Sequence, residues 1–410
     1  MLLNKAKSLI TAIIGKIGKT TKPTQKFIHH ILILYMGLRG KYNFINMSRY
    51  GRYDEKSYRN NMEKPFDWAE FNTQLILESC SKELIMAYDP SYLSKSGKKT
   101  PNVGKFWSGT AQAVKRGIEI GSLAVVDITN ATAFSLEAVQ TPLFPKDITR
   151  QENSIDHHLN VILNRVNEAK KLNIRHLCVD GYFAKAKFIN GLTKKSHLHA
   201  ICKLRPDANL RYTYHGPKHI GRGRPKLYEG KVNTNLIDRR RIRYCFDIDE
   251  NVSVFSGIVY SISLKRLVRI VHIEHYGTDG FAKGHAILFS TDLDLSPENI
   301  LHYYKQRFQI EFLFRDAKGF TGLENCQARS ENKINFHVNA SLSSVSLAKA
   351  LHYLPIPIEQ RESFSMLDIK TLYFNQYITD LIFSKLAIDL SCEKYRRLYE
   401  ECLSIGRLAA

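Results

Sequence analysis

Two continuous apolar runs in the first half of the chain end in an aspartate and stop at once at a turn residue. Residues 84–89 (LIMAYD) are followed by Pro90, and residues 177–180 (LCVD) are followed by Gly181. Continuous apolar runs of this length predict strands that are buried on both faces of a sheet. Ligands gather outside strand ends in open sheets, so an aspartate there is well placed for chemistry. Most strand-end aspartates only form turns or cap helices, so neither residue is decisive alone.

The pattern around these runs alternates between strand and helix periods, which predicts an α/β region from about Glu83 to Pro206. The further predicted elements are strands at 121–128, 133–139 and 284–290, helices at 156–172, 184–192 and 336–354, and β-hairpins within 246–275. The strands at 121–128 and 133–139 are expected to pair in an antiparallel manner. Together these elements predict a mixed α/β fold with an antiparallel β element inserted before its last strand.

One predicted helix, residues 301–318 (LHYYKQRFQIEFLFRDAK), presents several reactive side chains on one face. Tyr304, Arg307, Glu311 and Lys318 fall at i, i+3, i+7 and i+14, within a sector of about 60° on an α-helix. A carboxylate can hold a divalent cation, while cations and a phenol can bind phosphate oxygens on either side of it. The alternative is a solvated helix face stabilised by i,i+4 ion pairs, which is what most charged stripes are.

Composition adds a strong positive charge to this picture. The chain of 410 residues has 60 Lys and Arg against 39 Asp and Glu, a net charge of +21, and 44% of its residues are hydrophobic. Such a composition is globular and long enough for two or three domains. The positive charge favours a polyanionic partner, with nucleic acid first and an anionic membrane surface second.

The apolar segments and the cysteines indicate in which cellular compartment the protein is expected. The apolar run at 27–38 is interrupted by His29 and His30, and no segment reaches the length of a membrane span. The seven cysteines are scattered, and none forms a Cys-x-x-Cys pair. This usage predicts a reducing compartment and argues against a zinc site. We therefore expect a cytoplasmic protein that does not enter a membrane.

The first 60 residues are strongly basic, with 12 Lys and Arg against 2 Asp and Glu. Within them, residues 42–62 predict two short helices around Gly51, with Asp54 as the cap of the second. This is a helix-turn-helix pattern, whose polar second helix could lie on DNA. A basic packing module is an equally good interpretation, because short helix pairs around a glycine are common.

A second basic segment, residues 94–105 (SKSGKKTPNVGK), follows the run that ends at Asp89. Its Lys98 and Lys99 suit a phosphate backbone. Asp127 also closes an apolar run and is a rival to Asp89 for the first acidic position. We rank Asp89 higher because this basic loop lies beside it in the sequence.

A third basic segment, residues 205–243, has 11 Lys and Arg against 3 Asp and Glu, with tyrosines between them. It contains residues 221–226 (GRGRPK), in which Arg222 and Arg224 have the form of a short arm that enters a narrow minor groove. The motif is short, so a flexible basic loop is the alternative.

The Tyr-x2-Arg-x3-Glu-x6-Lys spacing of Tyr304, Arg307, Glu311 and Lys318 resembles the signature of the IS-four group of bacterial insertion-sequence transposases. The segments YDPSYLSKSGKKT around Asp89 and VDGYFAK from residue 179 resemble the first and second acidic motifs of that group. The resemblance runs from about residue 84 to residue 350. It implies a ribonuclease-H-like catalytic core with an inserted antiparallel β region, preceded by a helical N-terminal DNA-binding domain.

The resemblance also implies how the chain is divided. The expected parts are a helix-turn-helix-like DNA-binding domain at 1–78, a catalytic core at 79–205 and 284–355, a basic β-rich insertion at 206–283, and C-terminal helices at 356–410.

The chemistry implied is Mg²⁺-dependent cutting of double-stranded DNA at terminal inverted repeats and strand transfer into target DNA. Asp89, Asp180 and Glu311 would hold two Mg²⁺ ions, with Mn²⁺ as a possible substitute. Tyr304, Arg307 and Lys318 would bind DNA near the cut. A homodimer in a synaptic complex and a nucleoid-associated place in a bacterial cytoplasm are further expectations. Two alternatives stay open, a metal-dependent nuclease without strand transfer and an inactive transposase-derived DNA-binding protein.

Overall fold

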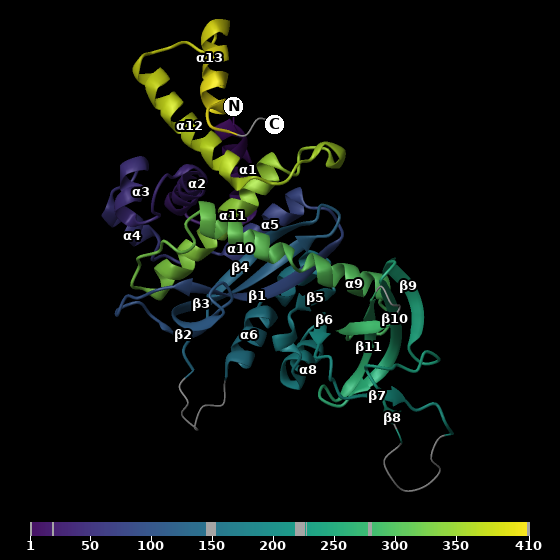
Figure 1. The fold of residues 1–410 in the computed structure, drawn as a ribbon. Coiled ribbons are helices and arrows are strands. Elements are labelled where there is room, and N and C mark those ends of the chain that lie inside the picture. The colour runs from purple at the N-terminus through teal and green to yellow at the C-terminus, as the bar shows by residue number, and fades with distance from the viewer. Residues whose placement is uncertain are drawn as a thin grey trace. The chain divides into compact units, whose positions relative to one another are not determined.

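A computed structural model describes residues 2–18, 20–144, 153–217, 226, 228–277 and 281–407. The chain divides into two compact units. Unit 1 comprises Met1–Lys82, Pro90–Leu143 and Gln309–Ala410, and unit 2 comprises Glu83–Asp89 and Phe144–Phe308. Each unit combines helices with strands, so the mixed α/β class predicted from the sequence is confirmed (Figure 1).

Unit 1 holds most of the described helices. Its elements are α1 (Leu2–Lys16), α2 (Lys22–Gly37), α3 (Phe44–Tyr50), α4 (Glu55–Asn61), α5 (Trp68–Ser79), β2 (Gly104–Ser108), β3 (Ala113–Asp127), β4 (Thr132–Gln140), α10 (Gln309–Phe320), α11 (Glu331–His352), α12 (Met366–Lys385) and α13 (Glu393–Ser404). Strands β2 and β4 pair in antiparallel fashion with successive parts of β3. The predicted neighbours at 121–128 and 133–139 are therefore confirmed. The predicted helix pair around Gly51 also forms, as α3 and α4, and Asp54 caps α4.

Helix α11 is buried along most of its length although it carries several polar side chains. The Asn339 amide donates to Ala138 O and accepts from Ala138 N–H, both at 2.8 Å. Lys349 Nζ donates to Ala133 O at 3.0 Å. Each of these buried polar groups has a backbone partner on β4, which removes most of the cost of its burial. The hydrogen bonds hold α11 across β4 (Figure 1).

The N-terminal helices pack on α11 through aromatic side chains. Because His337 Nε2 donates to Gly322 O at 2.8 Å, its Nδ1 accepts from the Tyr35 hydroxyl at 2.7 Å. The Tyr42 hydroxyl donates to Tyr35 O at 2.9 Å. Gly322 has φ 72°, and a Cβ there would lie 2.2 Å from the Tyr42 ring, so only glycine fits. These contacts join α2 and the α2–α3 connection to the helix α11 within unit 1.

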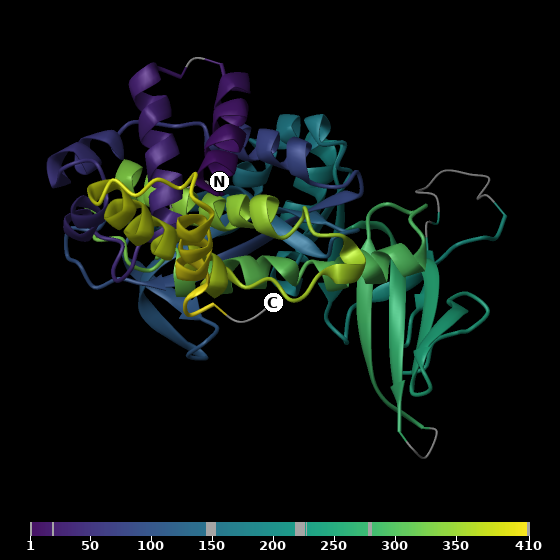
Figure 2. The ribbon, with the colours of Figure 1, turned by 90° about the horizontal axis from the view of Figure 1, so that it is seen from above.

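Unit 2 is built on a mixed sheet. Its elements are the first part of β1 (Leu84–Ser94), α6 (Ser154–Leu163), α7 (Val166–Lys171), β5 (His176–Val179), α8 (Ala186–Lys195), β6 (His199–Leu204), β7 (Leu210–Thr213), β8 (Tyr228–Lys231), β9 (Arg243–Asp249), β10 (Val252–Ser261), β11 (Arg266–Tyr276), β12 (Ala282–Ser290) and α9 (Pro297–Gln306). The strand order in this unit is β1-β5-β6-β12-β11-β10-β7-β8, and β9 also pairs with β10. The antiparallel strands β9 to β12 run side by side in both views (teal to green, Figures 1 and 2). The predicted hairpins within 246–275 and the strand at 284–290 are confirmed.

The first strand is longer than the sequence pattern predicts. It was expected to stop at Asp89, but β1 continues through Pro90 to Ser94. Proline has no backbone N–H, so a strand can continue through it at a position where no hydrogen bond from that N–H is needed. Beyond Pro90 the strand lies beside β3 in unit 1, where the Tyr92 hydroxyl donates to Arg116 O at 2.7 Å.

The prediction of a single helix at 301–318 is wrong, because two helices form there. Helix α9 ends at Gln306 and α10 begins at Gln309. At the break, Phe308 N–H bonds to Lys305 O, three residues back, instead of continuing the i−4 pattern. The apolar face of α9 packs on β5, β6, β11 and β12 in unit 2, whereas α10 packs on α11 and β4 in unit 1. The first half of the segment therefore packs on the core of unit 2, and the second half packs on the core of unit 1. The predicted helix at 156–172 is likewise divided into α6 and α7.

Among the described residues, no helix is both long enough and apolar enough to cross a membrane.

The buried His337 predicts a pH dependence of stability. Burial lowers its pKa from 6.5 to about 4 in the folded chain. Between pH 6.5 and 4 the unfolded chain therefore binds more protons at this residue, so folding stability falls as the pH falls, by up to about 3 kcal/mol. His337→Gln can keep both hydrogen bonds but does not titrate. We expect the stability difference between wild type and His337→Gln to shrink, or reverse in favour of the variant, from pH 7.5 to 4.5.

Urea unfolding followed by the fluorescence of Trp68, which lies 5.2 Å from Phe336 in unit 1, measures this difference. The exposed His302→Gln is the matched control and should show the same pH dependence as wild type. A constant offset between His337→Gln and wild type across this pH range would contradict the assignment.

Candidate active site

The pairing of β1 with β5 relates the positions of Asp89 and Asp180 in unit 2. In the parallel ladder between β1 and β5, Met86 pairs with Leu177 and Ala87 pairs with Cys178. The same register continued by two residues places Asp89 opposite Asp180. Paired residues of parallel strands point to the same face of the sheet, so both carboxylates emerge on one face. Each is half-buried.

The backbone around Asp180 holds its carboxylate at the end of β5. Asp180 follows Val179, the last residue of the strand, and its Oδ1 accepts from Tyr182 N–H at 3.0 Å. The Cys202 thiol on β6 donates to Asp180 O at 3.0 Å. Burial raises the pKa of the Asp180 carboxyl, while the Tyr182 N–H and the Arg307 guanidinium act to lower it. The site thus favours a cation, either Arg307 or a bound metal ion, near this acid.

Tyr304 and Arg307, at the C-terminal end of α9, belong to the same part of unit 2. The Arg307 guanidinium carbon lies 5.7 Å from the centre of the Tyr304 ring. Burial raises the pKa of the Tyr304 phenol to about 12, and the charge of Arg307 opposes the rise. The Asp180 carboxylate also contributes to the rise. The structure therefore brings three of the predicted residues, Asp180, Tyr304 and Arg307, into one electrostatic environment.

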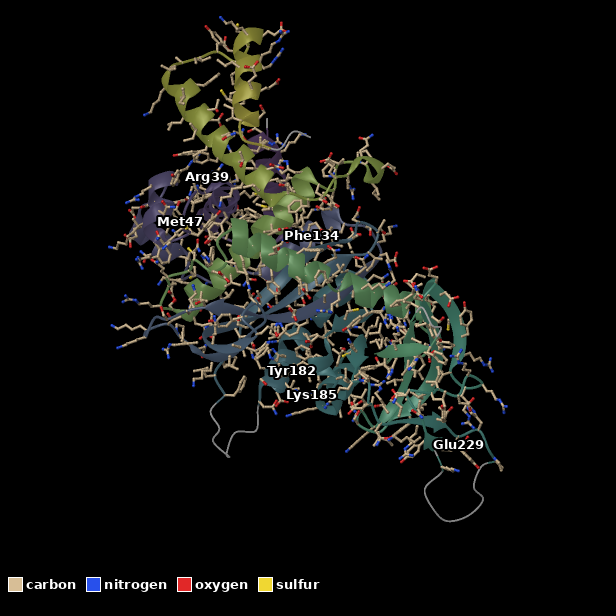
Figure 3. All side chains as sticks on the ribbon, in the orientation of Figure 1. Arg39, Met47, Phe134, Tyr182, Lys185 and Glu229 are labelled. Atoms are coloured by element: carbon tan, nitrogen blue, oxygen red, sulfur yellow. The ribbon has the colours of Figure 1, made fainter. Side chains whose placement is uncertain are left out.

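Two residues that the sequence argument did not single out lie just after Asp180. Tyr182 is 49% exposed, and Lys185 Nζ lies 3.7 Å from the centre of its ring (Figure 3). Lys185 also helps to lower the pKa of Asp180, after the larger effects of burial, Tyr182 and Arg307. The only signal in the sequence was their position, two and five residues beyond the aspartate in VDGYFAK. An exposed aromatic ring and a cation at this place suit a nucleotide.

Glu311 and Lys318 are on α10, in unit 1. Glu311 is half-buried in the first turn of α10, where an acidic side chain also stabilises the helix dipole. The Arg315 guanidinium, one turn further along α10, bonds to the Asp316 carboxylate at 3.1 Å. Lys318 Nζ donates to Tyr92 O at 3.2 Å. The interruption of the predicted helix puts Tyr304 and Arg307 in unit 2 and this pair in unit 1.

The rival acid Asp127 has a structural environment. It is fully buried at the end of β3 in unit 1. Its carboxylate accepts from Ser81 N–H and Oγ–H, at 2.7 and 2.6 Å, and from the backbone and side-chain N–H groups of Asn130, at 3.0 and 2.7 Å. Four hydrogen bonds occupy its two oxygens, which is the arrangement of a turn-forming aspartate. This environment supports the ranking of Asp89 above Asp127.

The remaining predicted DNA contacts are distributed differently. Lys98 and Lys99 are exposed in the connection between β1 and β2, in unit 1. Arg222 and Arg224 lie outside the described residues.

The donor set on β1 and just after β5 suits a hard divalent cation. Asp89 and Asp180 offer carboxylate oxygens, which Mg²⁺ and Mn²⁺ prefer over nitrogen or sulfur. Within the described ranges, no three His, Cys, Asp or Glu side chains are grouped closely enough to hold a metal ion. The β1–β5 register, continued by two residues, thus relates two of the three acids expected.

Part of this chain is similar to a family of known proteins. No curated protein matches the chain. Residues 146–346 match the family model described as transposase DDE domain. The matched span includes Asp180, the Tyr304–Arg307 pair and Glu311, while Asp89 precedes it. The mixed α/β architecture also fits a ribonuclease-H-like domain of that family. Just under half of the chain is thus similar to the DDE domain of transposases.

Proposed function

We propose that this chain is the transposase of a bacterial insertion sequence of the IS-four group. It would cut DNA at terminal inverted repeats and join the freed ends to target DNA. The observation that carries the proposal is the β1–β5 register, which, continued by two residues, would pair Asp89 with Asp180 on one face of the sheet. The charge of Arg307, a member of the signature, acts on the same acid.

The three acids of the site are Asp89, Asp180 and Glu311. The first two are supported by their adjacent strand positions, and Glu311 is assigned from the spacing of the signature. They would hold two Mg²⁺ ions, for which Mn²⁺ can substitute, through carboxylate oxygens alone. When bound, these ions activate the attacking oxygen and stabilise the negative charge on the leaving 3′ oxygen. The role of the protein is to hold the three carboxylates ionised and fixed in position.

The basic side chains of the signature would bind the phosphates next to the cut. Arg307 donates in a planar fork that matches two phosphate oxygens, and Tyr304 lies against it. Lys318 is a point charge held by the backbone of β1. Tyr182 and Lys185 add a ring and a cation beside Asp180. These residues would fix the scissile phosphodiester relative to the acids.

The reaction would proceed in four successive displacements at phosphorus. Water first attacks the phosphodiester at the end of the element, the bond to the 3′ oxygen breaks, and a 3′-OH is released. That hydroxyl then attacks the opposite strand and forms a hairpin, which a second water reopens before the end joins target DNA. A homodimer that holds two ends in a synaptic complex is part of the proposal, because both ends must be cut and joined together.

Replacing the acids should separate cutting from binding. We expect Asp89→Asn, Asp180→Asn and Glu311→Gln each to abolish Mg²⁺-dependent cleavage of a duplex that carries the flanking inverted repeat. Binding of the same duplex should be nearly unchanged, because each substitution keeps the shape and removes only a negative charge. Cleavage is measured on labelled strands and binding by fluorescence anisotropy.

The exposed Glu298→Gln, on α9 but outside the candidate site, is the matched control and should cut like wild type. Cleavage retained by Glu311→Gln would refute the assignment of the third acid. Pre-cut ends added to wild type test the nuclease alternative, since an enzyme that cuts but never joins them is not a transposase.

Arg307 should matter for the chemical step more than for affinity. Arg307→Gln removes a charged donor, whose hydrogen bonds contribute about 1.5–3 kcal/mol, so cleavage at saturating DNA should fall roughly 10- to 150-fold. The neighbouring Lys305 is exposed on the same helix, and Lys305→Gln should change the rate little. Single-turnover rates with the repeat duplex measure both. Equal effects of the two substitutions would mean that Arg307 contributes only general positive charge.

A further inference from the structure

Unit 1 contains a large cavity that the catalytic residues do not use. Its volume is about 1090 Å³, and it is lined by four stretches of chain. These are the start of α3, residue Arg59 on α4, the connection at 94–100 between β1 and β2, and residues 324–333 up to the first turn of α11. The N-terminal helix pair thus faces the basic connection across one hollow.

The lining is strongly positive. Seven of its nineteen residues are Lys or Arg, and Glu324 is the one acidic side chain among them. Neutral donors, such as Asn43 and Thr100, fill much of the rest. Such a concentration of one sign of charge in a concave surface attracts and holds anions.

Three of these cations bond to the chain segments that surround the cavity. Lys95 Nζ donates to Glu324 O at 2.8 Å and to Cys326 O at 2.6 Å, which ties the basic connection to the segment before α11. Lys333 pairs with Glu63 at 2.5 Å. Arg59 donates to Glu55 at 2.9 Å and lies 4.5 Å from the centre of the Phe44 ring. These bonds shape the cavity with no ligand bound.

The other four cations have no such counter-charge. Over the described ranges, Lys41, Lys98, Lys99 and Arg329 have no acidic side chain within ion-pair distance. Four like charges around one hollow repel one another, and a polyanion that entered would relieve the repulsion. Because the segments around the cavity are already bonded to one another, the polyanion could bind without first ordering the connection at 94–100.

The size and the distribution of charge favour an extended polyanion over a small one. The volume exceeds the range of about 300–1,000 Å³ that is usual for a small-molecule pocket. The cations come from separate segments instead of converging on one point, and hydroxyl and amide donors lie between them. Phosphate and sugar contacts of proteins with nucleic acid have this composition.

We propose that this cavity binds the sugar–phosphate backbone of DNA, and that Lys41, Lys98, Lys99 and Arg329 are its phosphate contacts. The inference rests on the proposed function for the kind of polyanion. In this proposal α3 and α4 form one side of a site for the DNA backbone. Binding at this site should not depend on base sequence. Lys318, whose Nζ lies 3.9 Å from Glu324, connects the rim of this site to the helix of Glu311 within unit 1.

The test is the salt dependence of DNA binding by the full chain, in a buffer without divalent ions. Fluorescence anisotropy between 50 and 200 mM NaCl would compare a duplex that carries the inverted repeat with a scrambled duplex of equal length. The variants are Lys98→Gln/Lys99→Gln and Arg329→Gln. Lys385→Gln/Lys394→Gln is the matched control, because it removes two exposed lysines of α12 and α13 outside the cavity.

Each lost phosphate contact should reduce the slope of log Kobs against log salt by about 0.9, so by about 2 for the double variant and about 1 for Arg329→Gln. The reduction should be the same on both duplexes, and the control should keep the wild-type slope. An unchanged slope in both cavity variants would overturn the proposal. Weaker binding confined to the repeat duplex would overturn it too, because it would assign these residues to base readout. A wild type that binds with these slopes but never cuts would leave the cavity in place and refute only the proposed activity.

Discussion

The parallel pairing of β1 with β5 is the constraint on which the account of this protein depends. A shift of one residue in that register would turn Asp89 to the opposite face from Asp180 and leave a single carboxylate at the sheet edge. The register is fixed from both sides by buried residues, since Ala87 and Cys178 are inaccessible to solvent. The packing of the apolar core of unit 2 therefore determines the positions of these two carboxylates.

A second constraint is the imbalance of charge. The buried acids and cations of unit 1 are satisfied locally, as the four hydrogen bonds to Asp127 and the bond from Lys349 to β4 illustrate. The surplus positive charge is left at the surface and in the cavity beside α3 and α4. A protein with +21 net charge gains from a polyanionic partner, and the positions of Lys98 and Arg329 show where unit 1 would receive it.

Much of the fold could be predicted from the sequence because its strands are apolar and its helix caps are standard. The strand before Asp180, the hairpins of unit 2 and the Asp54 cap of α4 all follow from local pattern. The break between α9 and α10 could not be predicted, because residues 306–309 contain no glycine or proline and the interruption arises where the chain passes from one core to another. The same limit applies to β1 beyond Pro90, which depends on β3, a partner distant in the sequence. In the candidate site, Asp89 and Asp180 could be chosen because each closes an apolar run of the sequence. Tyr182 and Lys185 became visible only as a cation–aromatic pair in the structure.

The most direct test of the central claim is a titration of the purified chain with Mn²⁺, followed by electron paramagnetic resonance of the free ion. Wild type, Asp89→Asn, Asp180→Asn and the exposed Glu298→Gln would be compared without DNA and again with the repeat duplex. If Asp89 and Asp180 hold the same metal, both of their variants lose the same Mn²⁺ site, while Glu298→Gln keeps it. Wild-type Mn²⁺ binding by Asp89→Asn, together with its loss in Asp180→Asn, would contradict the pairing.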